Sequence, residues 1–304
     1  MKLKTLLSIG MFCLYLVSIT GCQGQSPLTF LRPTETPLPP TATATVAPTA
    51  TVTPTPTITP TSAPTATPTP SKATIAAGPV TAPILLYHHV SSSSETQDSR
   101  YNIPPEKFEE QIKWLYDNHY QTINVSDLTN LIYSGGEIPQ RPVVITFDDG
   151  NIDNFNNAYP ILKKYGFVAT FYVVQTYVNG TDMISADQLK ELVQNGWEIG
   201  SHSKTHAHLP AIGEDMLSEE IRMSKLNLEE LLGTPVNSFA FPFGEINDNI
   251  IRLTSSYGYK SAVGLGESVT HGMNSIFYLA RIEIENDFSM EQFINKLPWS
   301  GPLQ

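Results

Sequence analysis

Residues 143–150 read Val143-Val144-Ile145-Thr146-Phe147-Asp148-Asp149-Gly150, an apolar, β-branched run that ends in two acids and a glycine. The run is typical of a buried strand, and α/β enzymes place their sites at the carboxyl ends of such strands. Neighbouring side chains of a strand point to opposite faces, so both acids serve one site only if the chain bends, which Gly150 permits. The alternative is a helix-capping Asp beside a turn Asp, so the pair alone identifies no site.

The same alternation of short apolar runs with capped amphipathic segments continues from Pro79 to Gln304 and predicts repeated βα units in one α/β domain. The expected strands are Ile84–His88, Val143–Phe147, Val168–Val174, Trp197–Gly200, Ser238–Phe241, Lys260–Val263 and Tyr278–Ile284. The expected helices are Pro105–Asn118, Ser126–Tyr133, Asn154–Lys164, Ser185–Gln194, Asp215–Leu232, Asp248–Ser256 and Ser289–Lys296. Capping-box spacing marks two helix starts, and glycines end several helices: Ser185 with Gln188, Ser289 with Gln292, then Gly166, Gly196, Gly233 and Gly258.

A second polar cluster follows the predicted strand at 197–200, where His202 and His206 stand four residues apart. One helical turn would bring both imidazoles to one face, and neutral imidazole is a common zinc ligand. Two surface or helix-capping histidines are the alternative interpretation, but a strand-end Asp-Asp-Gly in the same domain makes chance a poor explanation. The only cysteines are Cys13 and Cys22, so histidine and carboxylate must carry any metal chemistry in the domain.

The first 22 residues have the order of a secretory signal, with a basic start, an apolar stretch from Leu6 to Ile19 and small residues before Cys22. Ile19-Thr20-Gly21-Cys22 resembles a bacterial lipobox, which implies that residues 1–21 are removed and that Cys22 is lipidated. We therefore expect an exported protein, anchored by lipid to a bacterial membrane. A transmembrane helix is the alternative, but the apolar run is shorter than the ~18 residues of a span.

Residues 22–78 form a Thr/Pro-rich segment that lacks large apolar side chains and predicts a disordered linker before a catalytic domain at 79–304. The whole chain has 18 Lys and Arg against 29 Asp and Glu, a formal net charge of -11. A nucleic-acid-binding protein needs a basic surface, so no nucleic acid partner is expected.

The segments Thr146-Phe147-Asp148-Asp149-Gly150 and Ser201-His202-Ser203-Lys204-Thr205-His206 resemble, in order and spacing, the first two motifs of the polysaccharide deacetylases. This family is carbohydrate esterase family four, also called the NodB homology domain. The resemblance covers most of the chain after the linker and implies a distorted (β/α) barrel with about seven strands.

The resemblance also implies roles for four residues. Asp149, His202 and His206 would bind a divalent metal, most simply zinc, with positions left for water and the acetyl oxygen. Asp148 would be the base. Such a metal lowers the pKa of water toward ~7 and polarises the amide carbonyl.

The third family motif, usually Arg-x-Pro-Tyr, matches Ala240-Phe241-Pro242-Phe243 here, so Ala240 stands in place of the arginine. The backbone N–H of Phe243 can still donate to a tetrahedral oxyanion. Arg281, on the last predicted strand, is the expected substitute for the arginine that orients the catalytic aspartate. A surface ion pair is the alternative for Arg281.

The general acid must also come from an unusual place, because the chain has no Asp-x-x-Asp-Trp motif and no convincing Leu-x-x-x-His near its C-terminus. Residues 84–90, Ile-Leu-Leu-Tyr-His-His-Val, resemble the family branch of the poly-N-acetylglucosamine deacetylases, which also lacks the third-motif arginine. This implies that His88 is the acid. His89 would point to the other face of the strand as a structural residue, and three histidines are expected at surface or loop positions: His119, His208 and His271.

The sequence thus predicts a metal-dependent hydrolase that removes acetyl groups from N-acetylglucosamine-containing polysaccharide. Acetylxylan and peptidoglycan remain alternative substrates. A barrel that binds glycan without catalysis is a third interpretation, supported by the missing arginine.

Overall fold

The computed structural model describes residues 72–92 and 99–301. The expected signal peptide, the lipidation site at Cys22 and most of the linker lie outside these residues. Within the described ranges, no helix combines the length and the apolar character that crossing a membrane requires.

The centre of the domain is a path of seven parallel strands in the order β12-β11-β10-β9-β8-β3-β14. In chain order they are β3 (Ile84–Tyr87), β8 (Pro142–Phe147), β9 (Thr170–Val173), β10 (Glu198–Ser201), β11 (Ser238–Ala240), β12 (Ser261–Val263) and β14 (Ile282–Glu283). The short strand β6 (Gln121–Thr122) pairs with the start of β8. The expected α/β barrel is confirmed, and each predicted strand contributes to it.

The segment that leads into β14 joins the two ends of this path. Leu279 forms a parallel bridge with Val263, and its N–H donates to the carbonyl of Ala262 at 2.8 Å. Three residues later Ile282 pairs with Leu85 of β3. The strand predicted over Tyr278–Ile284 is therefore divided, because the chain changes its partner from β12 to β3 within it.

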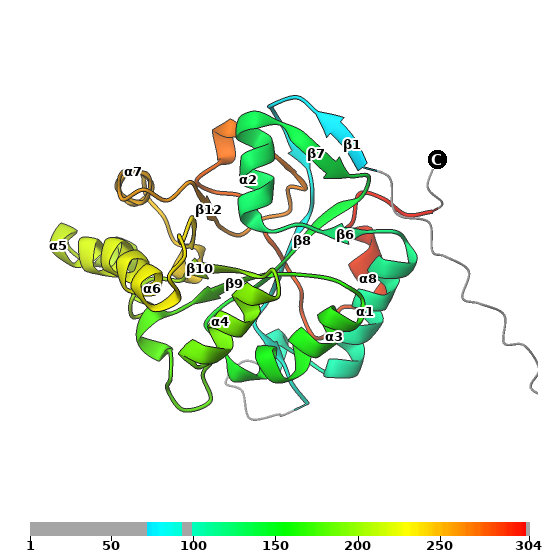
Figure 1. Ribbon diagram of the computed structural model, residues 1–304, viewed down its shortest axis with the longest axis horizontal. Helices are drawn as coiled ribbons and strands as arrows, with labels where there is room; N and C mark the ends of the chain where they lie inside the picture. Colours follow the sequence, from blue (N-terminus) through cyan, green and yellow to red (C-terminus); the bar gives the residue numbers. More distant parts are fainter. Residues whose placement is uncertain (1–71, 93–98, 302–304) are drawn as a thin grey trace, which may run out of the picture. The chain divides into compact units, whose positions relative to one another are not determined.

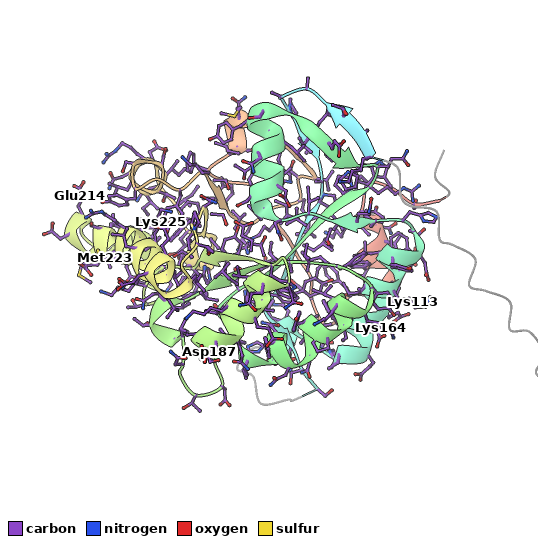
Figure 2. The ribbon with its side chains drawn as sticks, in the orientation of Figure 1. Lys113, Lys164, Asp187, Glu214, Met223 and Lys225 are labelled. Atoms are coloured by element: carbon purple, nitrogen blue, oxygen red, sulfur yellow. The ribbon has the colours of Figure 1, made fainter. Side chains whose placement is uncertain are left out.

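Eight α-helices are assigned in the described residues, and Figure 1 shows most of them arranged around the strands. They are α1 (Pro105–Asp117), α2 (Val125–Ser134), α3 (Tyr159–Lys164), α4 (Ala186–Gln194), α5 (Glu214–Leu217), α6 (Ser224–Leu232), α7 (Asp248–Ser256) and α8 (Met290–Asn295). The outer helix faces carry charged side chains such as Lys113, Lys164, Asp187 and Glu214 (Figure 2). Both capping boxes, at Ser185 and Ser289, are confirmed.

Two predicted helices contain π-helical segments. The helix expected over Asn154–Lys164 begins as a π-turn at Asn154–Ala158, and the helix expected over Asp215–Leu232 is interrupted by one at Ser218–Met223. Such π-segments are rare in proteins, and those that occur often lie near functional sites. Hydrophobic periodicity does not reveal a π-segment, because the segment differs from an α-helix in its backbone hydrogen bonds and not in its residue types.

The strands bury both faces, as the apolar runs predicted. One cluster packs the strands against the surrounding helices and includes Leu85, Ile145, Phe171, Phe239 and Ala262. The alternate residues pack with the apolar face of α2 in a second cluster, which includes Ile84, Val144, Tyr172, Ala240 and Val263. Helix α2 thus packs against these residues, and its Ser126 and Thr129 hydroxyls bond to Glu198 and Ser261 at the starts of β10 and β12.

Glu198 at the start of β10 fixes α2 in this position. Its carboxylate accepts bonds from the N–H and hydroxyl of Ser126, both at 2.8 Å, from Thr170 at 3.2 Å and from Ser238 at 2.7 Å. Burial raises the pKa of Glu198, although these four donors oppose that rise. The amino end of the barrel is therefore closed, and a substrate must approach the carboxyl ends of the strands.

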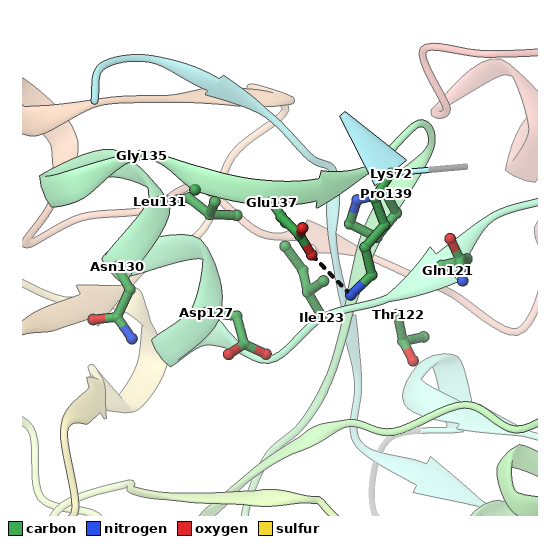
Figure 3. A pocket seen from close by; sticks show the side chains of 11 residues that line it. Lys72, Gln121, Thr122, Ile123, Asp127, Asn130, Leu131, Gly135, Glu137 and Pro139 are labelled. Atoms are coloured by element: carbon green, nitrogen blue, oxygen red, sulfur yellow. Dashed lines mark ion pairs between the residues drawn. The ribbon is translucent and has the colours of Figure 1, made fainter. Parts of the chain in front are cut away.

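The structure describes a strand within the last residues of the range predicted as linker. Strand β1 (Lys72–Ile75) lies inside the expected linker and pairs antiparallel with β7 (Gly136–Pro139). A polar cavity of about 420 Å³ lies beside the pair, where Lys72 Nζ is 3.7 Å from Glu137 (Figure 3). Composition could not reveal β1, because its Lys-Ala-Thr-Ile resembles the linker and only a partner distant in sequence orders it.

His271 is buried in a strand, whereas the sequence predicted a surface or loop position. It belongs to β13 (Thr270–His271), which pairs with β2 (Val80–Thr81), and it is only 1% exposed. His119 and His208 are exposed, as predicted. Pairing with a strand some 190 positions away in sequence buries His271, so no local pattern signals it.

Candidate active site and metal centre

The two aspartates leave the end of β8 through a strongly bent backbone. Asp149 has φ +73° and Gly150 has φ +91°, so the bend expected at Gly150 begins one residue earlier. Both carboxylates consequently face the same imidazole, because Nε2 of His202 is 3.7 Å from Asp148 Oδ2 and 3.6 Å from Asp149 Oδ1. A left-handed non-glycine residue is costly, and such strain concentrates at functional sites.

His202 and His206 meet through a loop, and the expected helical turn is wrong. Ser203 has φ +65° and His206 has φ +62°, conformations that no α-helix contains. The N–H of His206 donates to the hydroxyl of Ser203 at 2.9 Å. This loop places the two Nε2 atoms 3.2 Å apart.

Asp149, His202 and His206 fit the donor set of a metal ion. Oδ1 of Asp149 is 3.6 Å from His202 Nε2 and 3.5 Å from His206 Nε2. Tetrahedral ligands at ~2.0–2.1 Å from zinc lie about 3.3–3.4 Å from one another. His202 Nδ1 lies 2.9 Å from the carbonyl oxygen of Ala240, and as the donor in that bond it leaves Nε2 free as a ligand atom. Ala240, which stands where the family has arginine, thus orients a candidate metal ligand through its main-chain carbonyl.

Arg281 lies against Asp148, buried with only 1% of its surface exposed. Its two terminal nitrogens donate to the two oxygens of Asp148 at 2.6 and 2.7 Å, and Nε donates to the carbonyl of Gly264 at 3.2 Å. The surface ion pair considered from the sequence is therefore wrong. The bidentate bond fixes both the position and the plane of the Asp148 carboxylate.

Arg281 also determines the charge of Asp148. Burial alone would raise the pKa of this carboxyl, but the charge and hydrogen bonds of Arg281, with a contribution from the neighbouring His202, hold it at about 2. Asp148 is therefore an ionised hydrogen-bond acceptor at every physiological pH.

His88 lies just after β3 and is partly buried beside the acidic pair. Burial lowers its pKa, and the charges of Asp148 and then Asp149 oppose that change. Its ring lies against Tyr101, with centroids 4.7 Å apart, and its carbonyl accepts a bond from Asn154 Nδ2 at 2.8 Å. Asn154 is fully buried in the π-turn, so this irregular turn fixes the backbone that carries His88.

His89 has a different partner. Its Nδ1 is 2.6 Å from Asp153 Oδ2, and the interaction with Asp153 outweighs burial and raises the pKa of the imidazole. The two neighbouring histidines thus have separate surroundings.

Phe243 follows β11 in a left-handed conformation, with φ +59°, and 49% of it is exposed. Its ring centroid is 4.5 Å from that of His206. The side chain of Phe243 therefore lies beside the two-histidine cluster.

Glu220 is a functional candidate that the sequence analysis missed. It is 2% exposed, and its carboxylate accepts bonds from the N–H groups of Lys204 and Thr205, at 3.0 and 2.8 Å, and from the Thr205 hydroxyl at 2.6 Å. It thereby holds the loop between the two histidines. The available signal was an acid on the buried stripe of a helix, between Leu217 and Ser224.

A barrel with an arginine-bound aspartate beside a two-histidine, one-aspartate cluster has the site expected of a metal-assisted hydrolase. The family model of the polysaccharide deacetylases matches residues 135–262. A poly-β-1,6-N-acetyl-D-glucosamine N-deacetylase of Staphylococcus aureus is 30% identical over 224 residues, which cover 69% of this chain and 76% of that protein.

Two solved structures are also similar, each with 28% identity. The Streptococcus pyogenes deacetylase PplD, in complex with acetate, has a TM-score of 0.67 over 72% of this chain and 99% of its own. A polysaccharide deacetylase from Bacillus cereus has a TM-score of 0.64 over 72% of this chain and 69% of its own. The chain therefore belongs to the polysaccharide deacetylases and is a hydrolase of that class, as its first two motifs predicted.

Proposed function

We propose that this chain is a metal-dependent enzyme that removes acetyl groups from an extracellular polysaccharide containing N-acetylglucosamine. The observation that carries the proposal is the position of the arginine-bound Asp148 beside the ligand atoms of Asp149, His202 and His206. The similar Staphylococcus aureus protein, named as a poly-β-1,6-N-acetyl-D-glucosamine deacetylase, supports the choice of substrate.

In the proposed reaction, Asp149, His202 and His206 hold the divalent metal, most simply zinc. When bound, such an ion acidifies water and polarises a carbonyl group. Asp148 accepts the proton of the attacking water. Because its pKa of about 2 makes it a weak base, this transfer needs water that has been acidified.

The remaining groups act on the acetamide. The N–H of Phe243 donates to the oxyanion that forms as water adds to the carbonyl carbon. His88 then gives a proton to the leaving nitrogen as the C–N bond breaks, and acetate and a free amine are released. A lowered pKa makes protonated His88 a stronger acid, which suits this step. Arg281 keeps Asp148 ionised and oriented throughout.

The test is acetate release by the full-length, zinc-loaded chain from poly-β-1,6-N-acetylglucosamine, acetylxylan and peptidoglycan. We expect the first to be the best substrate. A preference for acetylxylan or peptidoglycan would correct the substrate alone. No acetate from any glycan, with zinc bound, would favour a glycan-binding barrel without catalysis.

The proposal includes a location outside the cytoplasm, with the chain anchored to a bacterial membrane by lipid on Cys22. The order of residues 1–22 and the Thr/Pro-rich segment after it support this location.

A further inference from the structure

A groove with a cavity volume of about 550 Å³ lies next to the loop that carries His206, lined by His208, Pro210, Ala211, Glu245 and Ile246. Its size is that of a small-molecule subsite, and three apolar side chains with a few polar groups are a usual lining. His208 stands two residues after the ligand His206, so the groove is a direct continuation of the metal-binding loop.

The groove presents a planar ring held in a fixed orientation. His208 stacks on Phe243 with ring centroids 4.0 Å apart and planes 6° apart, and Phe243 in turn contacts His206. His208 Nδ1 is 3.0 Å from Glu245 Oε2, which fixes the ring from its edge. The His208 side chain is nevertheless 60% exposed. Phe243 covers one face of the His208 ring and Glu245 holds its edge, so the other face is free to bind a ligand.

A pyranose ring has the matching chemistry. Its faces carry C–H groups that pack on flat apolar surfaces, and its rim carries hydroxyl and amide groups that need acceptors and donors. The stacked rings with Pro210, Ala211 and Ile246 offer the flat surface, and Glu245 offers a carboxylate acceptor. A carboxylate also suits the ammonium group of a sugar that has already lost its acetyl group.

We propose that this groove binds the sugar unit next to the one that is deacetylated, with His208 as the stacking surface and Glu245 as the polar contact. The inference rests on the proposed function and adds a determinant of chain-length preference to it. Binding there would be equal in the ground state and the transition state, because the groove contacts no reacting atom. It should therefore lower KM for an oligomer without changing kcat.

The experiment compares the zinc-loaded, full-length protein with its His208→Ala variant on two substrates, a β-1,6-linked N-acetylglucosamine pentamer and 4-nitrophenyl acetate, which has no second sugar unit. We expect KM for the pentamer to rise roughly 5- to 10-fold, as loss of one aromatic contact predicts. We expect kcat for the pentamer and the rate with the ester to stay within twofold. Glu245→Gln should show a smaller change of the same kind, and His119→Ala, at an exposed histidine outside the site, is the matched control.

Two results would overturn the inference. An unchanged KM for the pentamer in His208→Ala would mean that the groove does not bind a sugar unit of the substrate. Equal losses of activity on both substrates, with zinc retained, would mean that His208 acts in the chemical step. Failure of the proposed function gives a different result, since the wild-type chain itself would then release no acetate from the pentamer.

Discussion

The two adjacent aspartates differ in what surrounds their carboxylates. Asp148 is 2% exposed and bonded through both oxygens to Arg281, whereas Asp149 faces the imidazoles of His202 and His206. A carboxylate saturated by a guanidinium is poorly placed to be the main ligand of a cation, and one that faces two imidazoles is well placed. Their roles should therefore be separable by substitution.

We expect Asp148→Asn to abolish acetate release while zinc stays bound, and Asp149→Asn to weaken both. His88→Ala should keep its zinc and lose about 10²–10⁴-fold in turnover, as removal of an acid or base does. Metal analysis beside acetate assays measures both properties. His89→Ala is the control, because its imidazole bonds to Asp153, and only an effect of folding is expected. Full activity of His88→Ala together with a dead His89→Ala would show that the acid is misassigned.

Arg281 is expected to matter through Asp148 and not through the metal. Arg281→Gln removes the main cause of the low pKa of Asp148, so this pKa should rise and the acidic limb of the kcat–pH profile should move to higher pH. Zinc content should be unchanged. A variant with the wild-type pH profile would mean that Arg281 does not control the ionisation of the base.

Residue types and spacing pointed to side chains that the structure brings together, because metal and acid–base chemistry admits few side chains. The residues that support it were harder to find. Ala240 contributes a carbonyl and Asn154 bonds to the backbone of His88, so neither role depends on a local sequence pattern. Arg281 could be proposed only because the third motif lacks its arginine, so that another cation had to be sought for Asp148.

At the scale of elements, the loop from β10 to α5 depends on a helix more than ten residues away. Glu220 anchors the N–H groups of Lys204 and Thr205, which lie between the two candidate metal ligands His202 and His206. Since this loop is not helical, its left-handed residues need such external bonds to stay in place.

We expect Glu220→Gln to lower zinc affinity roughly 10- to 100-fold, the range typical of groups that support metal ligands. Competition with a chelator measures this, and unfolding by urea checks that the fold persists. Glu219→Gln is a matched control, because Glu219 is exposed and bonds to the Lys204 ammonium, not to the main chain of the loop. Equal zinc affinity of the two variants would contradict the positioning role.

Element types were predictable where an apolar run or a cap was strong, as in β8 and α4. The elements that were missed depend on distant partners. Strand β1 exists through its pairing with β7, and Gly135 is needed there because a Cβ would lie 2.4 Å from the carbonyl oxygen of Ile75. The closure through Leu279 and the π-segments likewise follow from tertiary packing, which a single sequence does not display.

At the scale of the whole molecule, one buried group links stability to pH. Burial lowers the pKa of His271 to about 4, although a hydrogen bond with the backbone of Ala82 opposes this. The unfolded chain, with a histidine pKa near 6.5, binds the proton more readily. The contribution of neutral His271 to the free energy of unfolding is therefore complete above pH ~6.5. It declines as the pH falls toward 4, by at most about 1.4 kcal/mol per pH unit.

We expect the His271→Gln variant to lose less stability than wild type between pH 7 and pH 5, because glutamine does not titrate. Urea unfolding at the two pH values measures the difference, and comparison with wild type cancels the titration of the other histidines. His119→Gln, at an exposed site, should keep the wild-type pH dependence. Identical pH dependence in wild type and His271→Gln would show that protonation of the buried imidazole does not lower the free energy of unfolding.

Cys22, in the segment before the domain, is expected to carry a lipid. If Cys22 is lipidated, fatty acid fed to cells should label the full-length chain and the label should partition with membranes. Labelling should vanish in Cys22→Ser, because no other cysteine follows residue 22. A single acyl chain holds a protein only marginally, so firm anchoring would require more than one acyl chain on the processed terminus. Label that survives in Cys22→Ser would remove the anchor and leave the chemistry of the barrel unchanged.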